Sequence, residues 1–180
     1  MARNWGGRYF ESMRRLPVIF AAFAALVIPV AATAAVRAVG DGSLVVKHGS
    51  APDGTPVVSL RITGSVIGHV DHGRIVIDGG PTNPDSASYP QVTGVPCITR
   101  DGETAQRCKG DKFSFRAVGG TYTVLIWGTD VNVVAVGTGS VKLAGLPGVA
   151  SGDGKYSRNG NDFVSLPSVQ TDRLTIGSGD

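Results

Sequence analysis

From residue 43 onward the chain is a series of short runs rich in β-branched and aromatic residues, separated by Gly, Asp, Asn and Pro. Alternation is clearest where Phe113, Phe115 and Ala117 flank the polar Ser114 and Arg116. No stretch there repeats apolar residues at helical spacing. Many short strands with frequent turn signals are typical of a β-sandwich or β-barrel. We therefore expect an all-β fold, with strands at 43–47, 57–62, 65–70, 74–78, 112–118, 121–127, 131–136, 140–144 and 173–176.

Two segments of the chain resemble each other. The run "HVDHGRIVIDG" (69–79) matches "AVGTGSVKLAG" (135–145) in its glycines and in the apolar positions between them. Self-similarity of this kind predicts a duplicated unit, whereas chance agreement in a chain rich in Gly and Val is the alternative. In the duplicated reading, 71–73 and 137–139 are the turns of equivalent hairpins, where glycine supplies a positive φ.

The duplication predicts one domain made of two similar four-stranded antiparallel halves. We place the single β domain at 37–180, with halves at about 43–79 and 112–145, a connecting disulfide loop at 80–111 and a C-terminal extension at 146–180. Its length is sufficient for one domain with a hydrophobic core.

The segment 1–36 has the composition of a targeting sequence. Four arginines and one glutamate precede Leu16, and the 21 residues from Leu16 to Val36 carry no charge and end in small residues. This plan predicts a cleaved secretory signal peptide, and the length also fits an uncleaved transmembrane signal anchor. Under either reading the β domain is exported, and it is secreted or anchored to the cytoplasmic membrane with its C-terminal part outside.

The formal net charge of +3 belongs to the first 15 residues. The whole chain has 17 Lys and Arg against 14 Asp and Glu, and removing the four arginines and the glutamate of that segment leaves 13 of each. A neutral domain gives no indication of nucleic-acid binding, which needs a basic surface.

The chain has two cysteines, Cys97 and Cys108. In an oxidising compartment such a pair predicts a disulfide. A zinc site is the alternative, but two isolated cysteines fall short of four ligands.

The stretch "GHVDHGRI" (68–75) shares six residues with the phosphate-binding loop of translation GTPases. That loop needs a helix after it, a lysine for the phosphates and a hydroxyl for magnesium. Here Arg74 and Ile75 stand at the last two positions, and a β-type run follows. The pattern therefore predicts no nucleotide site.

The same stretch offers possible metal ligands in His69, Asp71 and His72, with His48 as a fourth. Imidazole and carboxylate groups suit zinc or copper. Surface histidines in a polar turn are the alternative, because the matching positions of the second half, Ala135, Gly137 and Thr138, carry no ligands.

No arrangement of residues predicts catalysis: no Ser lies in a Gly-x-Ser-x-Gly context. The polar loop 151–162 lacks the spacing of a calcium-binding EF-hand, and we expect no cofactor. We expect a non-catalytic binding or structural module of the cell envelope or extracellular space, with an envelope or extracellular ligand. The alternative is a small metal-binding protein or hydrolytic enzyme that uses His48, His69, Asp71 and His72.

The stretch "GGTYTVLIWGTDVNVVAVGTGSVKLAG" (119–145), followed by "GKYSRNGNDFVSLP" (154–167), resembles segments of uncharacterised exported proteins of high-GC Gram-positive bacteria. The shared features are glycine and strand patterns. The resemblance implies an exported β domain and implies no activity and no functional residues.

Overall fold

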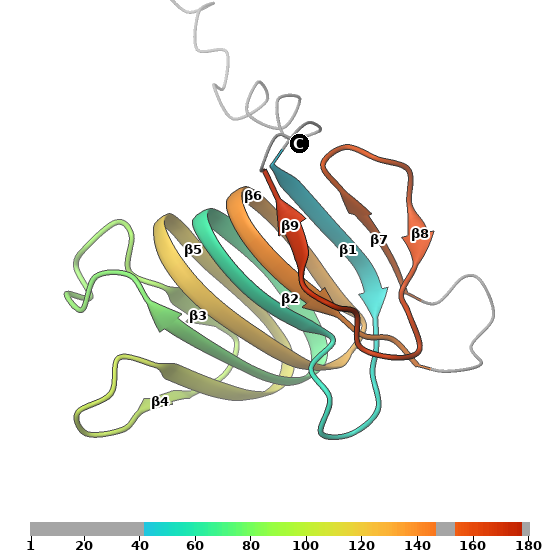
Figure 1. Ribbon diagram of the computed structural model, residues 1–180. Coiled ribbons are helices and arrows are strands. Elements are labelled where there is room, and N and C mark those ends of the chain that lie inside the picture. The colour runs from blue at the N-terminus through green and yellow to red at the C-terminus, as the bar shows by residue number, and fades with distance from the viewer. Residues whose placement is uncertain (1–41, 147–153, 178–180) are drawn as a thin grey trace, which may run out of the picture.

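The computed structural model describes residues 42–146 and 154–177, which form nine β-strands (Figure 1). The strands are β1 (Ser43–Gly49), β2 (Val58–Gly79), β3 (Gln91–Thr93), β4 (Cys97–Thr99), β5 (Gln106–Thr129), β6 (Val131–Leu143), β7 (Lys155–Arg158), β8 (Val164–Ser165) and β9 (Leu174–Ile176). The described residues contain no helix, and thus none that could cross a membrane. The all-β prediction is confirmed, and the predicted signal segment lies outside the described residues.

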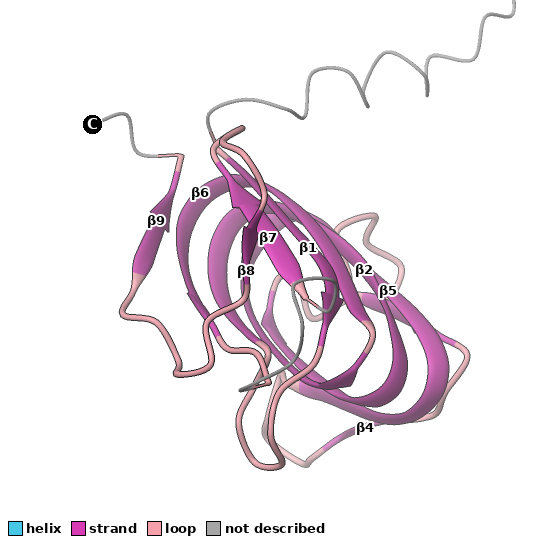
Figure 2. Cartoon of the chain, turned by 90° about the vertical axis from the view of Figure 1, so that its right-hand side faces the viewer, coloured by secondary structure: helices cyan, strands magenta, loops and turns pink. Residues whose placement is uncertain are grey.

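The strands form one open antiparallel sheet. Its order is β3–β5–β2–β6–β1–β7–β8, with β4 also paired to β5 and β9 to β6. Figure 2 shows how strongly β2, β5 and β6 curve, and how β7 lies beside β1 and β8 beside β7. We expected a sandwich or a barrel. The described strands instead form a single open sheet, which doubles over itself and encloses the core.

Three strands are far longer than the sequence predicts. β2 is one strand of 22 residues where we expected three, and β5 has 24 and β6 has 13 residues where we expected two strands each. The predicted hairpin turns at 71–73 and 137–139 are therefore wrong. Their glycines bend a continuing strand instead of ending it.

The predicted division into two halves is also wrong as an arrangement of strands. β2, from the first half, lies between β5 and β6, and the second half contains β6 and residues 112–129 of β5. Both edges of β2 bond to these neighbours, so the two segments build one sheet together. The segments expected as loop and extension also contain strands. Besides β9, which was expected at 173–176, these segments contain β3, β4, β7, β8 and the start of β5. Each of β3, β4, β7 and β8 is too short to show a pattern of its own.

The first bend of the sheet runs along a row of glycines. Gly64 of β2 is paired with Gly137 of β6 on one side and with Gly120 of β5 on the other. Gly64 and Gly137 have φ values of +152° and +147°, which side-chain-bearing residues rarely adopt. A Cβ atom on Gly64 would lie 2.2 Å from the carbonyl oxygen of Val136, so only glycine fits.

The second bend uses the glycine of "GHVDHGRI". Gly73 is paired with Gly128 on one side and with Gly110 on the other, and a Cβ atom on Gly73 would lie 2.1 Å from the carbonyl oxygen of Trp127. The segment is thus a bent part of β2 with strand on both sides.

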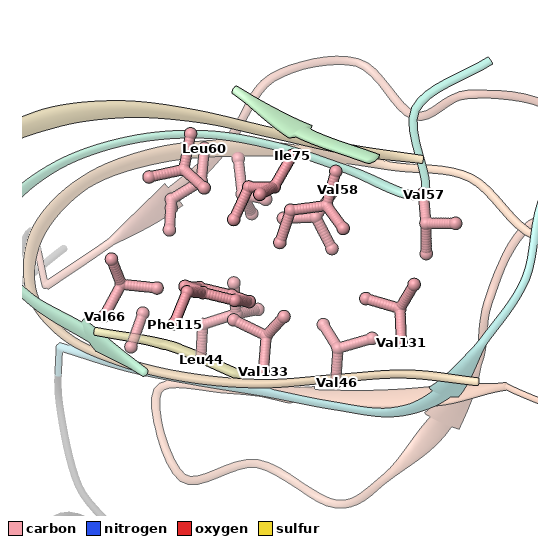
Figure 3. Packing of buried hydrophobic residues seen from close by; sticks show 14 of the residues in the cluster. Leu44, Val46, Val57, Val58, Leu60, Val66, Ile75, Phe115, Val131 and Val133 are labelled. Atoms are coloured by element: carbon pink, nitrogen blue, oxygen red, sulfur yellow. The ribbon is translucent and has the colours of Figure 1, made fainter. Parts of the chain in front are cut away.

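The bends fold the sheet into two layers that enclose the core (Figure 3). We call them the upper and lower layers, as they lie in that view. β2 contributes Val58 and Leu60 to the upper layer, Val66 to the lower and Ile75 to the upper again. Both edges of residues 122–126 of β5 therefore pair with β2, through residues 58–62 on one side and 75–79 on the other.

The core consists of aliphatic and aromatic side chains that point between the layers. They include Leu44, Val46, Leu60, Ile62, Ile75, Ile77, Phe113, Tyr122, Ile126 and Leu143, all almost fully buried. Burial of each such side chain stabilises the fold by roughly 1.5–3 kcal/mol.

Candidate functional site

The outer surface of the upper layer carries six cationic side chains. We call this surface the basic face, and its cations are Arg61, Arg74, Arg107, Lys109, Lys142 and Arg173. Five of them lie on strands at positions that alternate with buried ones, as Arg61 does between Leu60 and Ile62. Arg173 precedes β9 and lines a groove together with Arg61 and Lys142.

A cleft of about 490 Å³ opens at one end of the basic face. Its walls include the loop 51–55 and parts of β2 and β5, and we call it the Trp127 cleft. The indole Nε1 of Trp127 donates a hydrogen bond of 3.2 Å to the carbonyl oxygen of Gly54, which joins the loop to the sheet. The cleft thus has one wall of loop and one of strand.

Two cations are held side by side in this cleft. Arg74 is paired across the strands with Trp127 on one side and with Lys109 on the other. The guanidinium carbon of Arg74 lies 4.2 Å from the centre of the Trp127 ring, a cation–π contact that restricts the arginine. His72 and Asp53 also line the cleft.

Most of these cations have no acidic partner. Among the residues that the structure describes, Arg107 is the only one of the six with a carboxylate in ion-pair contact, that of Glu103. Asp78 lies on the same face, and its Oδ1 accepts a hydrogen bond of 2.6 Å from the Thr104 hydroxyl. The face therefore has an excess of positive charge, although the domain as a whole is neutral.

A second groove of about 220 Å³ lies between β2, β5 and β6 on the basic face. Arg61, Lys142 and Arg173 surround it. The hydroxyl-bearing side chains of Ser59, Thr123 and Ser140 line it as well. Hydroxyl groups can donate and accept hydrogen bonds, so the groove offers both charge and hydrogen bonding to a ligand.

The predicted disulfide between Cys97 and Cys108 is present. The two residues face each other across β4 and β5, so the bond attaches the short strand β4 to the edge of the sheet. A depression of about 340 Å³ adjoins the Trp127 cleft there, lined among others by Ile98, Arg100 and Arg107. The disulfide therefore supports one border of the basic face.

The predicted metal ligands are not assembled into one group. His72 Nδ1 contacts Asp111, His69 Nδ1 lies 3.3 Å from the hydroxyl oxygen of Ser114, and His48 Nδ1 lies 2.6 Å from Asp130 Oδ1. Within 42–146 and 154–177, no three His, Cys, Asp or Glu residues are placed to hold a metal ion. Because β2 bends at Gly73, His72 is paired with Asp111 and Thr129 while His69 lies beside Ser114 and Asn132.

His48 and Asp130 belong to a polar network at the end of β1. The hydrogen bond from His48 holds the pKa of Asp130 below its ordinary value, and Asn132 adds to this effect. Asn132 Oδ1 also accepts a hydrogen bond of 3.1 Å from the His48 backbone amide. His48 and Asp130 both have positive φ, a conformation that side-chain-bearing residues seldom adopt, and the hydrogen bonds of the network hold both residues in it. The contact between His48 and Asp130 is therefore explained by its structural role.

Sequence reasoning missed the basic face. The charge count of the domain sums to zero and hides the segregation of cations onto one surface. Alternation within 58–62 could have placed Ser59 and Arg61 outward, but the neighbours of Arg61 depend on strand register, which the sequence does not display.

Comparison of the chain with protein-family models, curated proteins and solved structures finds no match.

Proposed function

We propose that the chain is an exported, non-catalytic binding module of the cell envelope or extracellular space, and that it holds an anionic group in the Trp127 cleft. The observation that carries the proposal is the pair of adjacent cations, Arg74 and Lys109, without carboxylate partners among the described residues and with one of them stacked on an indole. Export rests on the arginine-rich and apolar character of residues 1–36.

The chemistry of the two cations fits carboxylate or phosphate. A guanidinium offers two parallel N–H donors to two oxygens of such a group, and an ammonium adds a compact charge beside it. Because Trp127 already restricts Arg74, less side-chain entropy is lost when an anion binds. The cleft is open to solvent and its groups are arranged for holding a charged ligand.

Titration calorimetry with sodium glucuronate and with inorganic phosphate tests the proposal. We expect binding that weakens with increasing salt and falls about tenfold or more in Arg74→Gln and in Lys109→Gln, because a charge-assisted hydrogen bond contributes roughly 1.5–3 kcal/mol. Arg116→Gln is the matched control, since Arg116 is an exposed arginine of the lower layer. Equal loss in all three variants, or no binding by the unaltered chain, would refute the proposal.

Amino-terminal sequencing of the protein recovered from its source tests export. A mature chain that starts near Ala35 or Val36 means a released module, and an intact start at Met1 or Ala2 in the membrane fraction means an anchored one. A chain with an intact start in the soluble cytoplasmic fraction contradicts export.

A further inference from the structure

The second groove and the Trp127 cleft open on the same face, and strand register gives their separation. Arg74 lies opposite Trp127, and Arg61 lies opposite Thr123, four residues away on the same segment of β5. Two strand spacings of ~4.8 Å and four residues at ~3.3 Å place the backbone positions of Arg74 and Arg61 roughly 16 Å apart. One extended ligand can therefore reach both.

The second groove has the composition of an anion site in its own right. Arg61, Lys142 and Arg173 surround it, and no carboxylate among the described residues lies in ion-pair contact with any of them. Three cations held close together without a carboxylate in ion-pair contact repel one another, and a bound anion relieves that repulsion.

We propose that this groove is a second anion subsite, and that a single linear acidic polysaccharide crosses the strands of the basic face and occupies both sites. The proposal rests on the anion-binding function of the Trp127 cleft and specifies its ligand class. One acidic group of the polymer binds at Arg74 and Lys109, and another binds at Arg61, Lys142 and Arg173. Each site raises the effective concentration of polymer at the other, so a chain that spans both binds more tightly than either acidic group alone.

The residues around the grooves favour a sugar polymer over a nucleic acid. Ser59, Thr123 and Ser140 offer hydroxyl groups to the hydroxyl groups of a sugar. Single-stranded nucleic acid is held by a positively charged groove together with stacking of successive bases on a series of aromatic side chains. Trp127 is the only Phe, Tyr or Trp side chain among the described residues that line the Trp127 cleft, the second groove and the adjoining depression, and Arg74 covers its ring.

Oligogalacturonates of increasing length, titrated into the full chain in mild detergent, test the inference. We expect affinity to rise about 10- to 100-fold once the oligomer is long enough to span roughly 16 Å. The double variant Arg61→Gln/Lys142→Gln should keep the sodium galacturonate site of the Trp127 cleft, lose the site in the second groove and lose the gain with length. Arg74→Gln/Lys109→Gln should lose the site in the Trp127 cleft and weaken the long oligomer, and Arg116→Gln should change neither.

The outcomes separate this inference from the function on which it rests. Monomer binding without any gain with length, or a gain that persists in Arg61→Gln/Lys142→Gln, overturns the second subsite and leaves the Trp127 cleft intact. Absence of binding of both monomer and oligomer overturns both. A poly(glycerol phosphate) chain that outcompetes the oligogalacturonate, or stronger binding of single-stranded DNA of equal charge, overturns the polysaccharide.

Discussion

Replacing Gly64 with alanine tests whether paired glycines fold the sheet. The residue has a φ of +152°, and a non-glycine residue held in such a conformation costs roughly 1–3 kcal/mol. The new Cβ would lie 2.2 Å from the carbonyl oxygen of Val136 and 2.8 Å from Gly137 Cα, so β2 and β6 must separate locally. Weakening two neighbouring ladder hydrogen bonds adds about 1 kcal/mol each. We expect a loss of about 3–5 kcal/mol, a large part of the 5–15 kcal/mol typical of a domain.

Urea unfolding followed by circular dichroism measures this loss. With a slope of about 2 kcal/mol per M, the midpoint should fall by about 2 M. Gly102→Ala is the matched control, because Gly102 has a φ of +78° and a Cβ atom there meets nothing within 4 Å, so it should cost only the roughly 1–2 kcal/mol of the backbone conformation. If Gly64→Ala and Gly102→Ala shift the midpoint equally, the close approach of the two strands does not explain the glycine.

Three further changes have expected outcomes. Replacing Cys97 and Cys108 with serine opens a loop of sequence separation 11 and should lower the unfolding free energy by about 3 kcal/mol. If adding reductant leaves the thermal unfolding midpoint of the unaltered chain unchanged, this expectation is contradicted. Tyr122→Phe removes the hydroxyl that donates to the carbonyl oxygens of Ser88 and Val118, at a cost of about 1–2 kcal/mol in urea unfolding. Burial raises the pKa of Tyr122 above 10.0, so the stability that depends on its neutral form is present below pH 10.0 and is lost as pH rises through the raised pKa. Ultraviolet titration can follow the ionisation of the phenol. His48→Ala should return the lowered pKa of Asp130 toward 3.8. In the unaltered chain the Asp130 carboxylate gives a small stabilisation that is present above pH 3.8 and is lost as pH falls through the lowered pKa. This stabilisation should be absent from the variant. Carboxyl-carbon NMR titration would show no change in that pKa if the hydrogen bond is not its cause.

The sequence predicted the strand composition well and the strand boundaries poorly. Period-two alternation marks Phe113, Phe115 and Ala117 as a strand because one side of it faces the core. A glycine between two β-type runs predicts a turn, and the same residue also permits a bend inside a strand. Only cross-strand pairing separates the two, as when Gly64 meets Gly120 and Gly137. The disulfide was predictable from the cysteine pair, since the alternative, a zinc site, needs four ligands and the chain has only these two cysteines.

The bends of β2 also explain why the basic face was hidden from pattern analysis. Arg61 and Arg74 are thirteen positions apart on one strand, so in a straight strand they would point to opposite sides and lie roughly 43 Å apart. In the structure the buried residues of β2 are even-numbered at Leu60 and Ile62 but odd-numbered at Ile75 and Ile77, so the alternation of buried and exposed positions shifts by one residue between them. Because of this shift, Arg74 points to the same side of the sheet as Arg61. The strand passes through the lower layer and returns, which brings the two arginines to opposite edges of one segment of β5, roughly 16 Å apart. The glycines at 64 and 73 therefore assemble the candidate binding surface as well as the core, and an alanine at either position should weaken anion binding even in the fraction of the protein that remains folded.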